Sequence, residues 1–199
     1  MPTLDIVKEY RKYYEAPTHP EIVDLEPAQY LTISGRGAPG GELHLKSIEA
    51  LYAVAAAVAA ITKLDGHDFE LPKLEGQWWF DEDKPLSEVP RDQWRWKLLI
   101  RVPDYVTSSV LSKAQSAVLN AKDVPRIHEV KIETIDEGQS IQMLHVGPYE
   151  NEAQTVVQIF SVMKARGLSA HGLHHEIYLS DVRNTDPSSA RTIVRYPVK

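Results

Sequence analysis

The sequence predicts an α+β protein made of two β-α-β-β halves. The prediction rests on three observations: a strand pattern closed by glycine occurs twice, a helical run follows each copy, and two strand-like runs follow each helix. Two such halves cannot cover their own sheets alone, so we expect them to pair about a pseudo-two-fold axis. The expected product is an antiparallel sheet with helices on one face and a ligand pocket at the seam between the repeats.

The first strand of each half shows alternation of apolar and polar residues. Tyr30 to Gly37 places Leu31 and Ile33 on one side and polar residues on the other, because neighbouring strand side chains point to opposite faces. Ser140 to Gly147 repeats this pattern. Each segment is therefore predicted to be a half-buried strand that ends at glycine.

The helix of each half is indicated by apolar residues at helical spacing. In the first half the run extends from about Leu43 to Leu64, and in the second from Asn151, a candidate helix cap, to Gly167. The apolar stripe of the first run consists of Leu45, Ile48, Leu51, Tyr52, Ala55 and Val58. Alignment of the two runs places Leu51 and Tyr52 over Ile159 and Phe160.

Two strands are expected to complete each half. In the first they are Phe69 to Phe80 and Trp94 to Val102, joined by an acidic loop that contains proline. In the second they are His174 to Ser180 and a run that ends at Pro197. The alignment matches Gln77–Phe80 with Glu176–Leu179, and Ile100–Pro103 with Val194–Pro197.

The remaining segments are read as an amphipathic N-terminal helix and a connector. The helix is expected within residues 1–15, and the connector contains a helix near 108–122 and a strand at 127–135. The turn Asp136 to Gly138 is a hairpin signal leading into the second repeat. We interpret residues 1–199 as a single domain, with repeats at about 29–103 and 138–199 and connecting elements at about 104–137.

Composition excludes several classes of protein. The net charge of −6 comes without a block of basic residues, which disfavours a nucleic-acid-binding surface. The chain has no cysteine, so disulfides, thiolate nucleophiles and cysteine-based metal sites are excluded. The most apolar stretch, Leu51 to Ile61, is too short to span a bilayer, and the N-terminus lacks the features of a signal peptide. A cytoplasmic protein without a membrane partner is expected.

Glu176 is the strongest candidate for a chemical role. Strand alternation puts Glu176 and Tyr178 together on the face opposite the core. One alternative is an exposed carboxylate, and the other is a carboxylate in a pocket. The corresponding face of the first half carries Glu75 and Trp79, so both halves place polar groups beside large aromatic residues. Two such faces would form an aromatic-walled site suited to apolar or cationic ligands.

All four tryptophans lie between Trp78 and Trp96. Trp78 matches Ile177 and is predicted to lie in the core. Trp79 matches Tyr178 and is the better candidate for a pocket wall. For Trp94 and Trp96, core and pocket remain open alternatives.

Histidines suggest two further interpretations. His145 and Tyr149 close a strand, where they serve either the turn or the ligand site. The cluster of His171, His174 and His175 beside Glu176 invites a metal hypothesis. Only His174 and Glu176 project together from a strand, and the helical His-Glu-x-x-His spacing is absent, so no metal is predicted. The Gly35 to Gly41 loop lacks a phosphate-binding pattern, and no cofactor is expected.

Taken together, these motifs resemble the gyrase-inhibitor-like (GyrI-like) small-molecule-binding family. The segments that carry the resemblance are Tyr30–Pro39, Leu51–Tyr52, Leu74–Trp79, Ile100–Asp104, His145–Tyr149 and Glu176–Ser180. The resemblance implies paired, SHS2-like β-α-β-β halves around a drug-accepting pocket whose central glutamate is Glu176. The tryptophan-rich first half is most similar to a subfamily of hydrolases that open the cyclopropane of DNA-alkylating compounds within an aromatic cage.

The leading hypothesis is a xenobiotic-handling hydrolase that adds water to flat electrophiles and uses Glu176, with a raised pKa, as acid or base. The alternative is a non-catalytic binder or sensor of hydrophobic cations, acting as a monomer or homodimer. In both cases the partner is a small molecule. The ligand-binding candidates are Trp79, Tyr178, Tyr149, Tyr52, Phe160, Trp96, Glu75 and His145.

Overall fold

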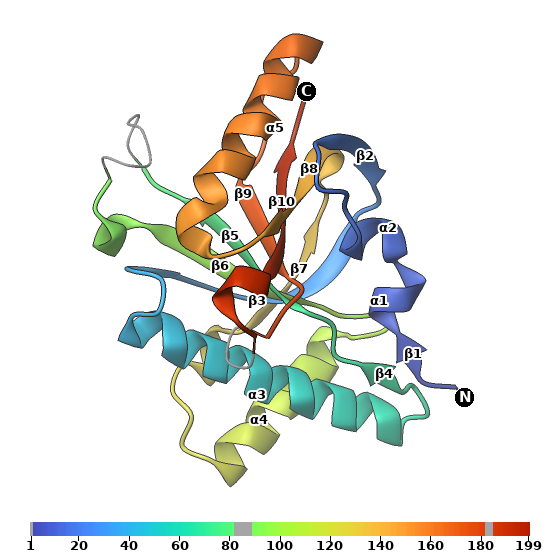
Figure 1. Ribbon diagram of the computed structural model, residues 1–199. Helices are drawn as coiled ribbons and strands as arrows, with labels where there is room; N and C mark the ends of the chain where they lie inside the picture. The colour runs from blue at the N-terminus through green and yellow to red at the C-terminus, as the bar shows by residue number, and fades with distance from the viewer. Residues whose placement is uncertain (1, 82–88, 182–184) are drawn as a thin grey trace. The chain divides into compact units, whose positions relative to one another are not determined.

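The computed structural model describes residues 2–81, 89–181 and 185–199 (Figure 1). The chain divides into two compact units that interleave along the sequence. Unit 1 comprises Met1–Glu9, Ala28–Pro72 and Gly76–Ile135. Unit 2 comprises Tyr10–Pro27, Lys73–Glu75 and Asp136–Lys199. Each predicted repeat therefore forms most of one unit, and the connector belongs to unit 1.

Unit 1 is built on an antiparallel sheet with strand order β5-β6-β3-β7. The strands are β3 (Ala28–Arg36), β5 (Leu74–Trp79, in unit 1 from Gly76), β6 (Arg95–Arg101) and β7 (Lys131–Ile135). β3 pairs with β6 and β7, with Leu31 opposite Ile100 and Ile132. A separate parallel pair joins β1 (Leu4–Asp5) to β4 (Phe69–Glu70), and helix α1 (Ile6–Glu9) follows β1.

Two helices pack together in unit 1, α3 (Glu42–Leu64) and α4 (Ser108–Ala121) (Figure 1). α3 also packs on β3 and β6, and its fully buried residues include Ala50, Leu51 and Val54. The α4 N-terminus is capped by Thr107, whose side chain accepts a hydrogen bond from the Val110 amide. α3 is long and apolar enough to span a membrane by length and composition alone. Its buried apolar face is equally what a core helix requires.

Unit 2 has an antiparallel sheet with strand order β2-β8-β10-β9. Its strands are β2 (Glu21–Leu25), β8 (Gly138–Val146), β9 (His174–Tyr178) and β10 (Arg191–Pro197). Helix α5 (Glu152–Arg166) packs on β8, and α2 (Arg11–Tyr14) precedes β2. The apolar core consists of Ile141, Met143, Ile159, Met163, Val194 and Val198.

The two units share topology and local register. In each, a strand, a helix and two further strands follow in order, and the last strand inserts beside the first. Gly37 and Gly147 end the first strands with φ of 129° and 128°, values that favour glycine. The Gly37 amide donates to the Trp94 carbonyl, and the Gly147 amide donates to the Ala190 carbonyl. The predicted α+β architecture is thus confirmed.

Several details of the sequence prediction were wrong. The strand expected from Phe69 to Phe80 is divided into β4 and β5, and the strand expected over 127–135 begins as a 3₁₀ turn, η3 (Ile127–Glu129).

The last strands of the two halves align two residues away from the predicted match. Leu31 and Ile141 are equivalent residues of the first strands. Leu31 lies opposite Ile100, whereas Ile141 lies opposite Tyr196 and not opposite Val194. The predicted hairpin at Asp136–Gly138 is absent from the described pairings. β7 pairs with β3, whereas both edges of β8 are taken by β2 and β10, so this segment passes from one unit to the other.

Two further differences concern helices. Asn151 occupies the N-cap of α5, but its side chain makes no capping hydrogen bond. A 3₁₀ turn, η4 (Tyr149–Asn151), runs directly into the helix, so Asn151 already has helical backbone angles and not those of a capping residue. The single N-terminal helix expected within residues 1–15 is divided into β1, α1 and α2.

Candidate functional site

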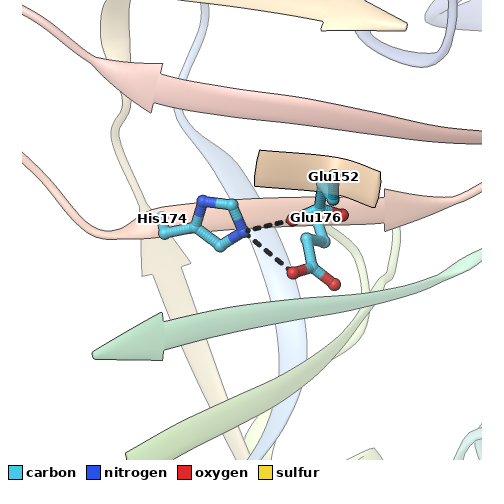
Figure 2. A group of neighbouring side chains, drawn as sticks. All are labelled: Glu152, His174 and Glu176. Atoms are coloured by element: carbon cyan, nitrogen blue, oxygen red, sulfur yellow. Dashed lines mark hydrogen bonds and ion pairs between the residues drawn. The ribbon is translucent and has the colours of Figure 1, made fainter. Parts of the chain in front are cut away.

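Three titratable side chains of unit 2 meet beside the first turn of α5 (Figure 2). Glu152 is the first residue of α5, and His174 and Glu176 come from β9. His174 Nε2 lies 2.8 Å from Glu176 Oε1 and 3.3 Å from Glu152 Oε1. The three side chains are between 12% and 17% exposed. One imidazole therefore bridges two largely buried carboxyl groups.

The alternation of β9 explains two of these positions. His175 and Ile177 are fully buried on one face, which leaves His174, Glu176 and Tyr178 on the other. The sequence predicted that these side chains share a face, but it placed that face opposite the core. Glu176 instead lies opposite Val194 of the apolar core, on the face of the sheet that α5 covers. α5 buries Thr155, Ile159 and Met163 at helical spacing, and Glu152 lies one turn before Thr155 on the same side.

The second ring nitrogen of His174 is also engaged. Nδ1 lies 2.7 Å from the Tyr196 hydroxyl, and the two rings are arranged edge to face with centroids 5.1 Å apart. Tyr196 in turn makes an edge-to-face contact with Phe160 at 5.1 Å. These contacts fix the plane of the imidazole, so that Nε2 faces the two carboxyl groups.

The environment moves the three pKa values in different directions. Burial disfavours charged histidine, but hydrogen bonds to Glu152 and Glu176 outweigh it and raise the pKa of His174 well above 6.5. Burial also opposes ionisation of Glu176, but the hydrogen bond and positive charge of His174 lower its pKa. Burial, reinforced by the negative charge of Glu176, raises the pKa of Glu152. The raised pKa expected for Glu176 was therefore wrong and belongs to Glu152.

Glu152 keeps one acceptor available. Its buried Oε2 has no hydrogen-bond partner among the described residues. Two carboxyl groups whose pKa values are moved in opposite directions, held by one imidazole, are an arrangement that acid–base catalysis uses.

Aromatic side chains surround this group within unit 2. Tyr149 and Tyr178 make an edge-to-face contact with ring centroids 6.1 Å apart, and Tyr149 is 41% exposed. Burial of the hydroxyl raises the pKa of Tyr149 despite a hydrogen bond with Thr192. Phe160 is 44% exposed. The structure thus brings Tyr149 together with Tyr178, and Phe160 together with Tyr196.

Two other predicted site residues of unit 2 have partners within the chain. His145 is buried, with Nδ1 2.9 Å from Thr155 Oγ1 and Nε2 3.1 Å from the Pro148 carbonyl. Glu75 is fully buried; it accepts a 2.5 Å hydrogen bond from the Tyr13 hydroxyl and lies 3.0 Å from His175 Nε2. Glu75 therefore belongs to a charged network on the opposite face of β9.

That network continues through Glu137 and Arg195. His175 Nδ1 lies 2.7 Å from Glu137 Oε1, and Arg195 Nη1 lies 3.2 Å from Glu137 Oε2. Arg195 also donates to Gln142 and to the Tyr13 carbonyl. The network holds β9, β10 and the segment around Tyr13 together on the face of β9 opposite the candidate site.

The remaining predicted residues lie in unit 1. Tyr52 is 40% exposed on α3, and Trp79 is half-buried at the end of β5. Trp96 is fully buried against Gly35 and edge to face with His44 at 5.1 Å, which is a core position. The ligand-binding roles of these three residues stay predictions.

The donor atoms of Glu152, His174 and Glu176 lie within 4.8 Å of one another, as metal ligands would. However, two ligands with bonds of about 2.1 Å to a tetrahedral ion lie roughly 3.4 Å apart. The 2.8 Å separation of His174 Nε2 and Glu176 Oε1 is instead a charge-assisted hydrogen bond. The geometry fits a histidinium between two carboxyl groups better than a metal site.

A groove of about 270 Å³ lies elsewhere, between α3 and α4 of unit 1. Alanines line most of it, with Val118 and Lys122. It offers no acid–base pair and is not the candidate site.

Sequence reasoning missed Glu152 and Tyr196. Glu152 is an acidic residue in the first turn of a helix, where it would ordinarily interact only with the helix dipole. The available signal was its position one turn before Thr155 on the buried side of α5. No pattern singled out Tyr196, which reaches His174 from the neighbouring strand β10.

Comparison with known proteins agrees with this architecture. Two crystal structures from Listeria innocua, an uncharacterized conserved protein and a hydrolase, share 37% and 36% identity with the chain. Each alignment covers 99% of this chain and 100% of the other, with TM-scores of 0.93 and 0.89. The EcmrR C-terminal domain is 10% identical over 91% of this chain and 97% of its own, with a TM-score of 0.61, and so shares the fold.

No match is found among curated proteins. The model of the GyrI-like small molecule binding domain matches residues 18–199, which include the whole Glu152–His174–Glu176 group. The chain belongs to the GyrI-like small-molecule-binding domain family.

Proposed function

We propose that this protein binds flat, electrophilic small molecules and hydrolyses activated cyclopropanes, which would protect the cell from DNA-alkylating compounds. One observation carries the proposal: His174 Nε2 lies 2.8 Å from Glu176 Oε1 and 3.3 Å from Glu152 Oε1, so one imidazole holds two largely buried carboxyl groups together. The 36% identity to a hydrolase from Listeria innocua supports it.

Glu176 is the proposed base. Its pKa is lowered by His174, so it is ionised at neutral pH and can accept a proton from water. The oxygen of that water forms a bond to the strained ring carbon. The adjacent carbon–carbon bond of the cyclopropane breaks, and its electron pair moves into the conjugated carbonyl of the ligand.

Glu152 is the proposed acid. Its pKa is raised by burial and by Glu176, so of the two carboxyl groups it holds a proton to the higher pH and is the one that donates to the carbonyl oxygen as negative charge develops there. The proton taken up by Glu176 restores the starting state when it returns to Glu152 through His174. Overall the ligand gains one molecule of water, and neither a metal nor a cofactor is required by the scheme.

Tyr149 and Tyr178 are proposed to orient the ligand. An exposed ring beside the carboxyl pair offers a face on which a flat conjugated molecule can stack. A cyclopropane already carries ring strain, so alignment of the ring with the attacking water is a large part of what the site must contribute to the reaction.

Mass spectrometry of a spirocyclopropyl dienone incubated with the protein tests the proposal, with ligand plus water as the expected product. Glu176→Gln should retain ligand binding and lower turnover by about 10²-fold or more, the usual effect of losing an acid–base group. Glu150→Gln, an exposed neighbour in η4, is the matched control and should behave as wild type. Unchanged turnover in Glu176→Gln would contradict the assignment.

The alternative is a binding protein for hydrophobic cations. It is favoured by the two carboxyl groups beside Tyr149 and Tyr178, which could combine charge pairing with cation–π contacts of about 0.5–2 kcal/mol each. In that case the ligand is recovered unaltered, and wild-type protein shows no product with any electrophile.

A further inference from the structure

We propose that His145 is a positioning residue, which ties the segment between Pro148 and Thr155 to β8 and thereby holds Tyr149 and Glu152 against β9. The consequence for turnover rests on the proposed function. The consequence for the placement of Glu152 does not, and it can be measured on the unliganded protein.

The contacts of His145 are divided between the two ends of this segment. The Pro148 carbonyl can only accept, so Nε2–H of His145 donates to it across 3.1 Å. In the neutral ring Nδ1 then accepts from the Thr155 hydroxyl at 2.9 Å. His145 is 5% exposed and Thr155 is 4% exposed, so neither ring nitrogen is offered to a ligand.

The segment between these two anchors carries the chemistry of the candidate site. It contains the exposed Tyr149 and the first residue of α5, Glu152. Asn151 provides no side-chain cap for the helix. The His145–Thr155 bond fixes this turn to β8, in addition to the contacts that Tyr149 and Glu152 themselves make with β9.

A tether is needed because Glu152 is held in an unfavourable position. Its carboxyl group is largely buried and lies near the negative charge of Glu176. Both effects would be relieved if the first turn of α5 moved outward. The contacts of His145 oppose that movement.

Unit 1 shows that the fold itself does not require this pair. Gly35 of β3 is the counterpart of His145 of β8. Gly35 lies opposite Trp96 of β6, and His145 lies opposite Thr192, the residue of β10 that corresponds to Trp96. The Trp96 ring fills the space beside Gly35. Ser47, which aligns with Thr155, is hydrogen-bonded by Arg126 instead. The histidine–threonine pair thus occurs in the unit that contains Glu152.

Titration of Glu152 provides the test. Glutamate side chains labelled with ¹³C would be followed by NMR against pH, with the neighbouring groups His174, Glu176, Tyr149, Tyr196 and His145 considered in the fit. Thr155→Val keeps the shape but removes the hydroxyl, and the midpoint of Glu152 should fall toward its ordinary value of 4.5. Thr155→Ser keeps the hydroxyl, so Glu152 should titrate with the wild-type midpoint in this variant.

The control is Thr62→Val on α3, which removes an equally buried hydroxyl whose partner is the Ala59 carbonyl. It should leave Glu152 unchanged. An unshifted Glu152 in folded Thr155→Val, or an equal shift in Thr62→Val, would overturn the positioning role. His145→Gln tests the same point from the other side of the bond and should shift Glu152 in the same direction.

Turnover of the spirocyclopropyl dienone should fall about 10- to 100-fold in Thr155→Val, mainly in kcat, as expected for a displaced catalytic group. Unchanged kcat in a variant with a shifted Glu152 would overturn the link to the reaction. If wild-type protein turns over no electrophile, the proposed function fails, whereas the titration still decides the role of His145.

Discussion

The ring of Trp96 lies so close to Gly35 that a Cβ at position 35 would come within 2.3 Å of ring carbon Cη2. The two residues are also cross-strand partners of β3 and β6. Glycine is therefore required here by packing, because only a residue without a side chain leaves room for the indole.

Gly35→Ala should consequently lower the free energy of unfolding by about 1–3 kcal/mol or more through overpacking. Urea denaturation would measure it, with the exposed neighbour Ser34→Ala as the control. The double variant Gly35→Ala, Trp96→Leu should recover part of the loss, since removal of the indole makes room for the new methyl group. Simple additivity of the two losses would contradict the proposed contact.

A second prediction separates the two carboxyl groups of the site. If Glu176 is the base and Glu152 the acid, turnover should depend on pH as a bell, in which the acidic limb reports ionisation of Glu176 and the alkaline limb that of Glu152. The apparent pKa of each limb is a property of the coupled pair and not of one residue, because the two groups interact directly.

Glu152→Gln should lower kcat by about 10²-fold and remove the alkaline limb, whereas Glu176→Gln should remove the acidic one. The pH–rate profile of each variant measures this, and Glu150→Gln again serves as the control. A Glu152→Gln profile that keeps its alkaline limb would assign that limb to another group.

The third prediction concerns stability at alkaline pH. Burial disfavours charged His175, but the negative charge of Glu137 and hydrogen bonds to Glu137 and Glu75 raise its pKa to about 9, from an ordinary 6.5. A group with a raised pKa stabilises the folded state fully below its unfolded value and loses that contribution as pH rises through its folded value. The free energy of unfolding should therefore decline between pH 6.5 and about 9, by at most roughly 3 kcal/mol from this group.

Urea denaturation across this range tests the decline. His175→Gln should be less stable by about 3–5 kcal/mol at neutral pH, because it leaves buried charges without their partner, and its stability should vary less with alkaline pH. The exposed His171→Gln should retain the wild-type profile. On the acidic side, burial opposes ionisation of Glu137, but His175 and Arg195 lower its pKa to about 2, so its contribution is lost as pH falls from 4.5 to about 2.

The sequence was most informative where a local period determines the outcome. Alternation correctly placed His174, Glu176 and Tyr178 on one face of β9. Helical spacing predicted α3, and Leu51, Ala55 and Val58 of the predicted apolar stripe are buried, but Leu45 and Tyr52 of that stripe are exposed. The glycines at 37 and 147 correctly marked equivalent strand ends.

Features that depend on non-local pairing could not be predicted. Whether β7 joins β8 or β3 is decided by which strand edge is available, and no local pattern encodes that choice. Glu152 joins His174 across 22 residues of sequence, through packing of α5 on the sheet. Of the three central residues, the sequence therefore predicted a site role only for Glu176, and it considered His174 only as a metal ligand. It misplaced the raised pKa, since that shift belongs to Glu152, which it did not identify.

The last prediction concerns Trp79, which the sequence predicts to bind ligand. Trp79 is half-buried, whereas the adjacent Trp78 is 9% exposed and contacts Trp94 edge to face at 6.1 Å. The two neighbours thus offer a matched pair, one predicted to bind ligand and one that lies in the core. Trp79→Ala should weaken ligand affinity by about 1–3 kcal/mol, as loss of an aromatic anchor does, with a modest change in Tm. Trp78→Ala should instead lower stability by about 3–5 kcal/mol. Calorimetric titration and thermal denaturation of both variants measure the difference, and full ligand affinity in Trp79→Ala together with a large fall in Tm would assign Trp79 to the core.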